Sequence, residues 1–125
     1  TVSLYNVLHV SDFHRDWADK GLLKPQDWNI NMCQSPDRDR ADVLPEEYKQ
    51  QAIKKIEEHI AWLEPQDKIS RATGGYKGII NFLNQQDNSH LLEQFFKDND
   101  PMDAVRNEVF EEVFPEYAEL RSYVK

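Results

Sequence analysis

The first residues that could do chemistry lie in one short run, Leu8–His14, with the sequence LHVSDFH. An aspartate and a histidine two positions apart, Asp12 and His14, follow an apolar segment there. Carboxylate oxygens and imidazole nitrogens at the end of a strand can bind a metal ion, and a two-metal site needs several more such ligands. The spacing of Asp12 and His14 is therefore compatible with part of the metal site of a metal-dependent hydrolase.

This run resembles the first metal motif of calcineurin-like metallophosphoesterases. That family continues with Gly-Asp and Gly-Asn-His or Gly-Asn-Asp segments, whereas no glycine of this chain precedes Asp or Asn. His59 and His90 stand alone in other segments. We therefore expect no metal site, with Asp12 as a carboxylate of a first helical turn and His14 as a surface residue. A divergent metallophosphoesterase stays as the third alternative.

A glycine-rich segment, Arg71–Gly78, is the second place where chemistry could occur. An anion could bind at the start of a helix that follows such a turn. The segment is not a P-loop, because the Gly-Lys-Ser/Thr ending is absent. We favour a flexible turn in which Thr73 caps the helix. Cys33 has no histidine paired with it in the sequence, so we interpret it as a packed strand residue and not as a nucleophile.

The elements expected to position these residues begin with two strands. Apolar residues are nearly continuous over residues 1–10, which predicts a strand buried on both faces. A short helix is expected from Ser11 to Lys20, with a stop at Gly21. Apolar and polar residues alternate over 28–33, which predicts a second strand. A strand, a helix and a strand in succession predict a parallel, right-handed crossover unit.

The rest of the chain is predicted to be helical. Apolar residues recur at helical spacing from Pro45 to Leu63, and shorter helices are expected over 75–84 and 89–97, from Pro101, and from Pro115. The expected fold class is α/β and predominantly helical, with two parallel strands followed by four to five helices. It forms a single domain over 1–125, divided into a strand-helix-strand unit over 1–36 and a helical region over 43–125.

Two strands cannot make a stable sheet alone, so we expect a partial barrel remnant. Its neighbouring strands would belong to a missing N-terminal part of the same protein, because the chain opens directly on the apolar segment without an initiator Met. The alternative is self-association through the strands. Either arrangement predicts an apolar sheet edge that another polypeptide covers.

Composition and charge exclude several classes of protein. The chain has 125 residues and a formal net charge of −8, and the acidic excess lies between Asp87 and Leu120. A surface of this sign repels phosphate backbones, so we expect no nucleic-acid partner. A single cysteine cannot form an internal disulfide, and no apolar run is long enough to span a bilayer. We therefore expect a cytoplasmic protein without membrane contact.

Four segments carry a recognisable family pattern. They are Val2–Val7, Trp28–Pro36, Val43–Lys49 and Met102–Glu116, the last reading D-x-x-R followed by F-P-E. Together they resemble the C-terminal portion of a radical SAM protein of the twitch or SPASM-related kind, including bacteriophage and marine microbial forms. The resemblance implies a partial (β/α) barrel that binds S-adenosylmethionine and a 4Fe-4S cluster and generates a radical on a substrate.

The resemblance also implies that this chain is catalytically inert alone. The cluster needs three cysteines in a Cys-x3-Cys-x2-Cys loop, and Cys33 is the only cysteine here. Residues at the C-terminal mouths of the barrel strands would face the cofactor or the substrate. Those residues are Asn6, His9, Asn31, Cys33 and Gln34.

The second alternative is a small acidic helical module that binds other proteins. In such a module the helices would close a core without the strands and would leave a separate exposed apolar patch. The radical SAM interpretation instead predicts two adjacent parallel strands with helices packed around them. The arrangement of the first ten residues therefore discriminates between these two hypotheses.

Overall fold

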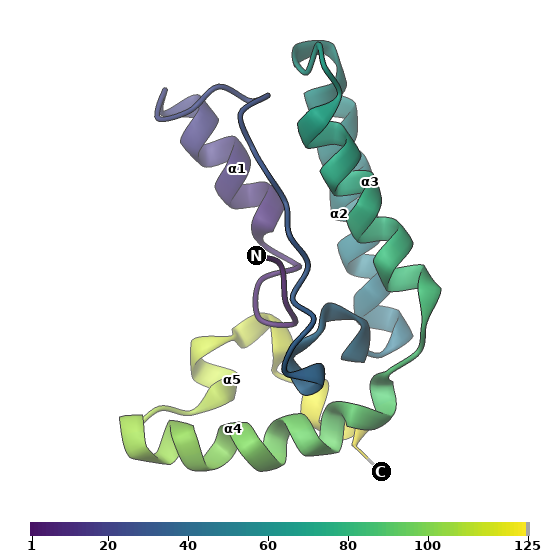
Figure 1. The fold of residues 1–125 in the computed structure, drawn as a ribbon. Helices are drawn as coiled ribbons and strands as arrows, with labels where there is room; N and C mark the ends of the chain where they lie inside the picture. Colours follow the sequence, from purple (N-terminus) through teal and green to yellow (C-terminus); the bar gives the residue numbers. More distant parts are fainter. Residues whose placement is uncertain (125) are drawn as a thin grey trace.

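A computed structural model describes residues 1–124, whose regular elements are all helical. The α-helices are α1 (Val10–Asp19), α2 (Glu46–Leu63), α3 (Arg71–Gln85), α4 (Leu92–Arg106) and α5 (Phe110–Val113). Short 3₁₀ helices cover Asp37–Asp39, Ala41–Val43, Glu64–Gln66, Ser89–Leu91, Pro115–Tyr117 and Leu120–Tyr123. Helices α2 and α3 form a hairpin, α1 lies on one side of it, and α4 crosses near its lower end (Figure 1).

Helix α2 follows directly from the local sequence. Pro45 occupies the N-cap position. The acidic side chains of Glu46 and Glu47 in the first turn stabilise the helix, because they lie at the positive end of its dipole. Residues at helical spacing form its buried face, namely Tyr48, Ala52, Ile53, Ile56, Ile60 and Leu63. The helix predicted from Pro45 to Leu63 is thus confirmed within one residue. None of the described helices combines the length and apolarity needed to cross a bilayer.

The predicted strand-helix-strand unit and the partial barrel are wrong. Residues 4–9 form turns, α1 begins at Val10, and residues 1–124 contain no strand. The two segments that were predicted as strands meet through one parallel β-bridge between Val2 and Met32. In this bridge the Val2 N–H donates to the Asn31 carbonyl at 2.7 Å and the Cys33 N–H donates to the Val2 carbonyl at 2.8 Å.

Asn6 supplies a physical reason why the first segment turns. Its Oδ1 accepts from the Ser3 N–H at 2.8 Å, and its Nδ2 donates to the Thr1 carbonyl at 2.9 Å. The Val7 N–H also donates to the Ser3 carbonyl at 3.1 Å. Such local bonds occupy backbone groups that a strand ladder would use. The apolar residues of this segment are still buried in the common core, so the apolar run indicated burial and not strand conformation.

Helix α3 begins at Arg71, so the glycine-rich segment is helical and is not a flexible turn. Asp67 caps it in place of Thr73, because the Asp67 Oδ2 accepts from the Thr73 N–H at 2.7 Å. A Cβ atom at Gly75 would lie 3.1 Å from Ile30 Cβ, whereas the same atom at Gly74 or Gly78 would meet nothing within 4 Å. Gly75 therefore allows the extended segment around Ile30 to pack closely on α3.

The two helices predicted over 89–97 and from Pro101 are one continuous helix, α4. Pro101 lies inside it and has no N–H to donate, which leaves the Lys97 carbonyl without its helical partner. Lys97 and Pro101 are both exposed, so water can bind that carbonyl and the helix continues past the proline. Helix α4 ends at Asn107, whose φ of 55° is the left-handed geometry that commonly terminates helices.

Candidate functional site

Two histidines and a tyrosine meet where α1, α2 and α3 converge. His14 of α1, His59 of α2 and Tyr76 of α3 are all buried. The Tyr76 hydroxyl lies 2.8 Å from His14 Nδ1, and His59 Nε2 lies 2.9 Å from the same nitrogen. The prediction that His14 is a surface residue is therefore wrong, and His59 is not a lone histidine.

The partners of His14 determine its tautomer. Its Nε2 lies 2.8 Å from the Pro25 carbonyl, which can only accept, so Nε2 carries the proton and Nδ1 is an acceptor. The Tyr76 O–H and the His59 Nε2–H are the two donors within reach of that acceptor. This arrangement connects three helices and the segment that follows α1 through a single imidazole ring.

Both histidines are held in their neutral form. Burial lowers the pKa of His14, although the Pro25 carbonyl and Asp67 act in the opposite direction. Burial also lowers the pKa of His59 to about 4, with a further contribution from the nearby His14 and Arg15. At neutral pH the pair therefore accepts and donates hydrogen bonds without carrying charge.

Aromatic rings enclose the histidine pair. The His14 imidazole lies nearly parallel to the rings of Trp28, at a centroid distance of 4.6 Å, and of Tyr76, at 5.5 Å. Trp62 stacks on His59 at 5.1 Å. Burial behind these rings also raises the pKa of the Tyr76 hydroxyl, which stays a proton donor. The rings cover much of the pair, and hydrogen bonds in such partly desolvated surroundings are stronger than in water.

A small charged cavity of about 130 Å³ opens beside His59. Its lining comprises Ser11, Asp12, Arg15, Lys55, Glu58 and His59. The Lys55 ammonium donates to Asp12 Oδ2 at 2.6 Å and to the Leu8 carbonyl at 2.5 Å. Two basic and two acidic side chains balance one another there, so the cavity has no net charge that would favour an anion or a cation.

The geometry argues against the metallophosphoesterase interpretation. Asp12 is paired with Lys55, and both nitrogens of His14 already have hydrogen-bond partners. His14 Nδ1 therefore has no free lone pair for a metal ion. The described residues contain no group of three side chains that could bind one together.

A second polar network joins the start of the chain to α4. The Tyr5 hydroxyl donates to Asn99 Oδ1 at 2.9 Å, and Asn99 Nδ2 donates to Asp103 Oδ2 at 2.6 Å. The Arg106 guanidinium then donates to Asp103 Oδ1 at 2.6 Å. Asn99 and Asp103 are buried. Burial raises the pKa of Tyr5 to about 12, and the carboxylates of Asp39 and Asp103 add to this effect, so Tyr5 remains protonated as the donor.

The first and the last of the four segments that resemble the radical SAM family lie against each other. The Tyr5 and Phe114 rings are 5.4 Å apart between centroids. His9 Nε2 lies 3.1 Å from Glu116 Oε1. Residues from opposite ends of the sequence therefore form one continuous contact region together with the Tyr5–Arg106 network.

The five residues predicted to face a cofactor are Asn6, His9, Asn31, Cys33 and Gln34, and they do not share a cavity. Asn6 lines a hollow of about 220 Å³ beside α1, and the other four lie outside its lining. Gln34 Oε1 accepts from Arg40 Nη1 at 2.9 Å. The strand ends that would have grouped the five are absent from residues 1–124. Their cofactor role stays a prediction.

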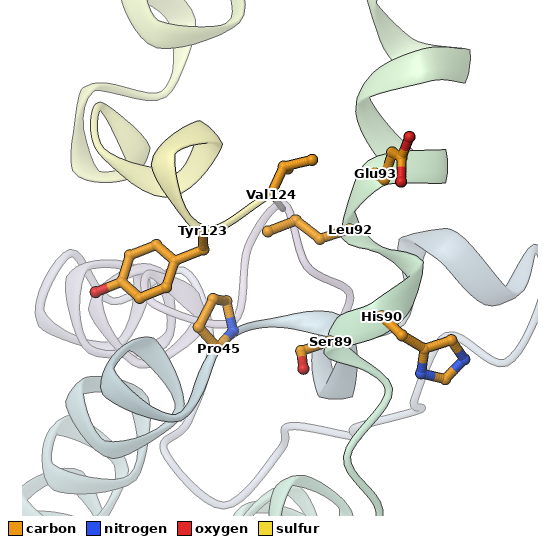
Figure 2. Close-up of a pocket in the computed structure, with 7 residues that line it drawn as sticks. All are labelled: Pro45, Ser89, His90, Leu92, Glu93, Tyr123 and Val124. Carbon is orange, nitrogen blue, oxygen red and sulfur yellow. The ribbon is translucent and has the colours of Figure 1, made fainter.

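A cavity of about 430 Å³ lies between the start of α2, the start of α4 and the last turn of the chain (Figure 2). Its lining comprises Pro45, Ser89, His90, Leu92, Glu93, Tyr123 and Val124. Ser89, His90 and Glu93 are residue types of a hydrolytic triad, but no hydrogen bond connects their side chains among residues 1–124. Figure 2 shows the His90 ring extending away from the side where Pro45 and Tyr123 lie. The cavity has no activated nucleophile.

The histidine pair is the buried polar cluster that the sequence did not reveal. His59 lies three residues after Ile56 and four before Leu63, so helical periodicity placed it on the buried face of α2. That signal could have identified a buried histidine. The identity of its partner could not be inferred, because His14 is 45 positions away in the sequence.

Comparisons of this chain with protein-family models, with curated proteins and with solved structures give no significant match.

Proposed function

We propose that this chain is the non-catalytic C-terminal segment of a radical SAM-like enzyme, in which it contributes packing and binding and not redox chemistry. The two adjacent parallel strands expected of such a segment are reduced, within residues 1–124, to the single Val2–Met32 bridge, and this finding favours the second candidate given below. The observation that supports this proposal is the Tyr5–Asn99–Asp103–Arg106 network. This network joins Val2–Val7 to Met102–Glu116, which are the first and the last of the four segments that resemble the radical SAM family. The two central members of this network, Asn99 and Asp103, are buried, and hydrogen-bonded buried polar groups favour one arrangement of a core.

The residues of this chain do not fit the iron-sulfur cluster itself. The cluster requires three thiolates, and Cys33 is the only cysteine of the sequence. We therefore assign the 4Fe-4S cluster and S-adenosylmethionine to a more N-terminal part of the same protein. When bound there, these cofactors supply the radical chemistry, and this chain completes the enzyme around them.

We assign the contact with that N-terminal part to α1. Phe13 and Trp17 of α1 and Leu22 just after it are exposed apolar residues. The hollow of about 220 Å³ lies beside Phe13 and Trp17, and Asn6 lines it as well. Exposed apolar surface next to a hollow is typical of interaction sites. Because Asn6 is one of the five residues that the resemblance places near the cofactor, the cluster-bearing part is the proposed occupant.

The test uses the complete reading frame that contains this chain, purified without oxygen and reconstituted with iron and sulfide. We expect a 4Fe-4S signal in electron paramagnetic resonance and consumption of S-adenosylmethionine under reducing conditions. Trp17→Lys should weaken that activity at least about tenfold, since burying an unpaired charge in an apolar contact costs more than 1.4 kcal/mol. Ile69→Lys changes another exposed apolar residue, at the α2–α3 turn, and serves as the matched control.

Three results would contradict this proposal. The first is a reading frame without a three-cysteine motif. The second is equal activity of the Trp17→Lys and Ile69→Lys proteins. The third is the finding that Trp17 mediates self-association of the purified chain.

An independent helical interaction module is the second candidate function. One specific observation favours it, because the core closes without strands and a separate exposed apolar patch remains on α4 and α5. A protein of this kind would bind its partner without any cofactor. The two candidates therefore differ in whether the complete reading frame binds iron.

A further inference from the structure

The C-terminal half of α4 and the adjoining α5 present an exposed apolar surface. Met102 is 45% exposed, Val105 89%, Val109 50% and Val113 49%, and we call these four residues the α4–α5 patch. Met102, Val113 and the half-buried Phe114 line one side of a hollow of about 320 Å³, and the rest of its lining is polar, namely Tyr5, Asn99, Asp103, Arg106 and Glu108. The patch therefore offers projecting apolar side chains beside a hollow whose lining is mostly polar.

The electrostatic surroundings of the α4–α5 patch are strongly acidic. Residues 98–113 include six carboxylates, namely Asp98, Asp100, Asp103, Glu108, Glu111 and Glu112. Ion pairs with three guanidinium groups, those of Arg38, Arg106 and Arg121, cover five of them. Glu112 has no ion pair among residues 1–124. A net negative charge thus remains around an apolar surface, which attracts a cationic partner and repels an anionic one.

The polar network that lines the hollow holds this surface in one arrangement. Asp103 is held by Asn99 Nδ2 and by the Arg106 guanidinium, both at 2.6 Å, and Arg106 also lies 3.4 Å from Glu108. All three of these partners belong to α4 or to the turn that follows it. A surface that is already ordered loses less conformational entropy when a partner binds.

We propose that the α4–α5 patch binds a basic amphipathic segment of another polypeptide. The apolar residues of that segment pack against the four apolar side chains of the patch. Its Lys or Arg side chains meet the carboxylates of Glu108 and Glu112 at the margin. This is the groove mode of helix recognition, in which apolar anchors supply affinity and flanking charges set orientation. The surface is separate from the α1 face, so this proposal does not depend on the radical SAM assignment.

The test is direct binding of a synthetic peptide in which Leu residues recur at helical spacing and Lys residues occupy the other positions. Fluorescence anisotropy of the labelled peptide gives its Kd for the whole chain. We expect binding that weakens as salt is raised, because exposed charge pairs are screened. We also expect the double variant Val105→Ser and Val113→Ser to raise the Kd at least about tenfold, and Glu108→Gln with Glu112→Gln to raise it several-fold.

Two controls make the outcome decisive. Ile69→Ser removes an equally exposed apolar residue at the α2–α3 turn and should leave the Kd unchanged. The same peptide with Glu in place of Lys should not bind. Equal effects of Ile69→Ser and of the double valine variant, binding of the acidic peptide, or no binding of the basic peptide would each overturn the proposal. Binding that responds to the glutamates and not to the valines would also overturn it, since that is charge attraction without docking.

Discussion

His59 Nε2 faces His14 Nδ1 at 2.9 Å, while the other nitrogen of His14 is bound to the Pro25 carbonyl. The two facing nitrogens can share one proton between them. A second proton would place two N–H groups against each other at hydrogen-bond distance. The pair in this arrangement therefore carries at most one positive charge.

The histidine pair predicts that the protein loses stability in acid. In the unfolded chain His59 titrates near its ordinary pKa of 6.5, and in the folded protein near 4. The unfolded state therefore binds more protons in this range. Stability is complete above about pH 6.5 and falls as the pH is lowered toward 4, by up to about 1.4 kcal/mol per pH unit for each proton.

Urea unfolding between pH 7 and pH 4 measures this effect. In His59→Gln the slope of stability against pH should be smaller than in the unsubstituted protein. His90→Gln is the matched control, because His90 is exposed and should leave the slope unchanged. The idea fails if the two variants show the same pH dependence.

The helix glycines predict a difference between two alanine substitutions. Gly78→Ala should raise the free energy of unfolding by about 0.5–1 kcal/mol, because alanine favours the helix and its Cβ meets nothing within 4 Å. Gly75→Ala should gain less or should destabilise the protein, since its Cβ would lie 3.1 Å from Ile30 Cβ. Urea midpoints of the two variants provide the comparison, and equal stabilisation would show that Ile30 does not pack on α3 as described.

The hydroxyl of Tyr117 predicts a measurable stability contribution. It donates to the Leu4 carbonyl at 2.5 Å, and both residues are buried. Tyr117→Phe should cost about 1–3 kcal/mol, because a buried carbonyl loses its partner. Tyr123→Phe removes the hydroxyl that contacts Glu47 at the exposed surface and should cost much less. If Tyr117→Phe and Tyr123→Phe lower the free energy of unfolding equally, the bond to Leu4 does not anchor the first segment.

The Tyr5–Arg106 network predicts coupling between residues that do not touch directly. Tyr5→Phe and Asp103→Asn should each destabilise the protein, and the double variant should lose less than the two effects added. A coupling of at least about 0.5 kcal/mol in this double-mutant cycle is expected for members of one network. Additive effects would show that Asn99 does not connect the two side chains.

A helix could be predicted where its own residues show both helical periodicity and a favourable first turn, and α2 is the clearest case. Its periodic apolar face and its acidic first turn depend only on residues within the helix. Helix α4 was divided wrongly at Pro101, because sequence alone does not show that the carbonyl which loses its partner faces solvent. The outcome there depends on tertiary position and not on propensity.

The first ten residues show why apolar runs mislead. Leu4, Val7 and Leu8 are buried as expected, but they reach the core from turns that the Asn6 side chain stabilises. The candidate site could be predicted even less, because its histidines lie on different helices. The sequence contains both histidines, but it does not show that they are close together. Their shared hydrogen bond depends on how α1 packs against the α2–α3 hairpin.

The bond between Tyr117 and Leu4 has a consequence for synthesis of the protein. Its donor is made 113 residues after its acceptor, so the opening turns lack this anchor until the last part of the described chain has left the ribosome. At a translation rate of about 5–20 residues per second, the Tyr117 donor is made roughly 6–20 s after Leu4, so the first segment forms its other core contacts before this bond.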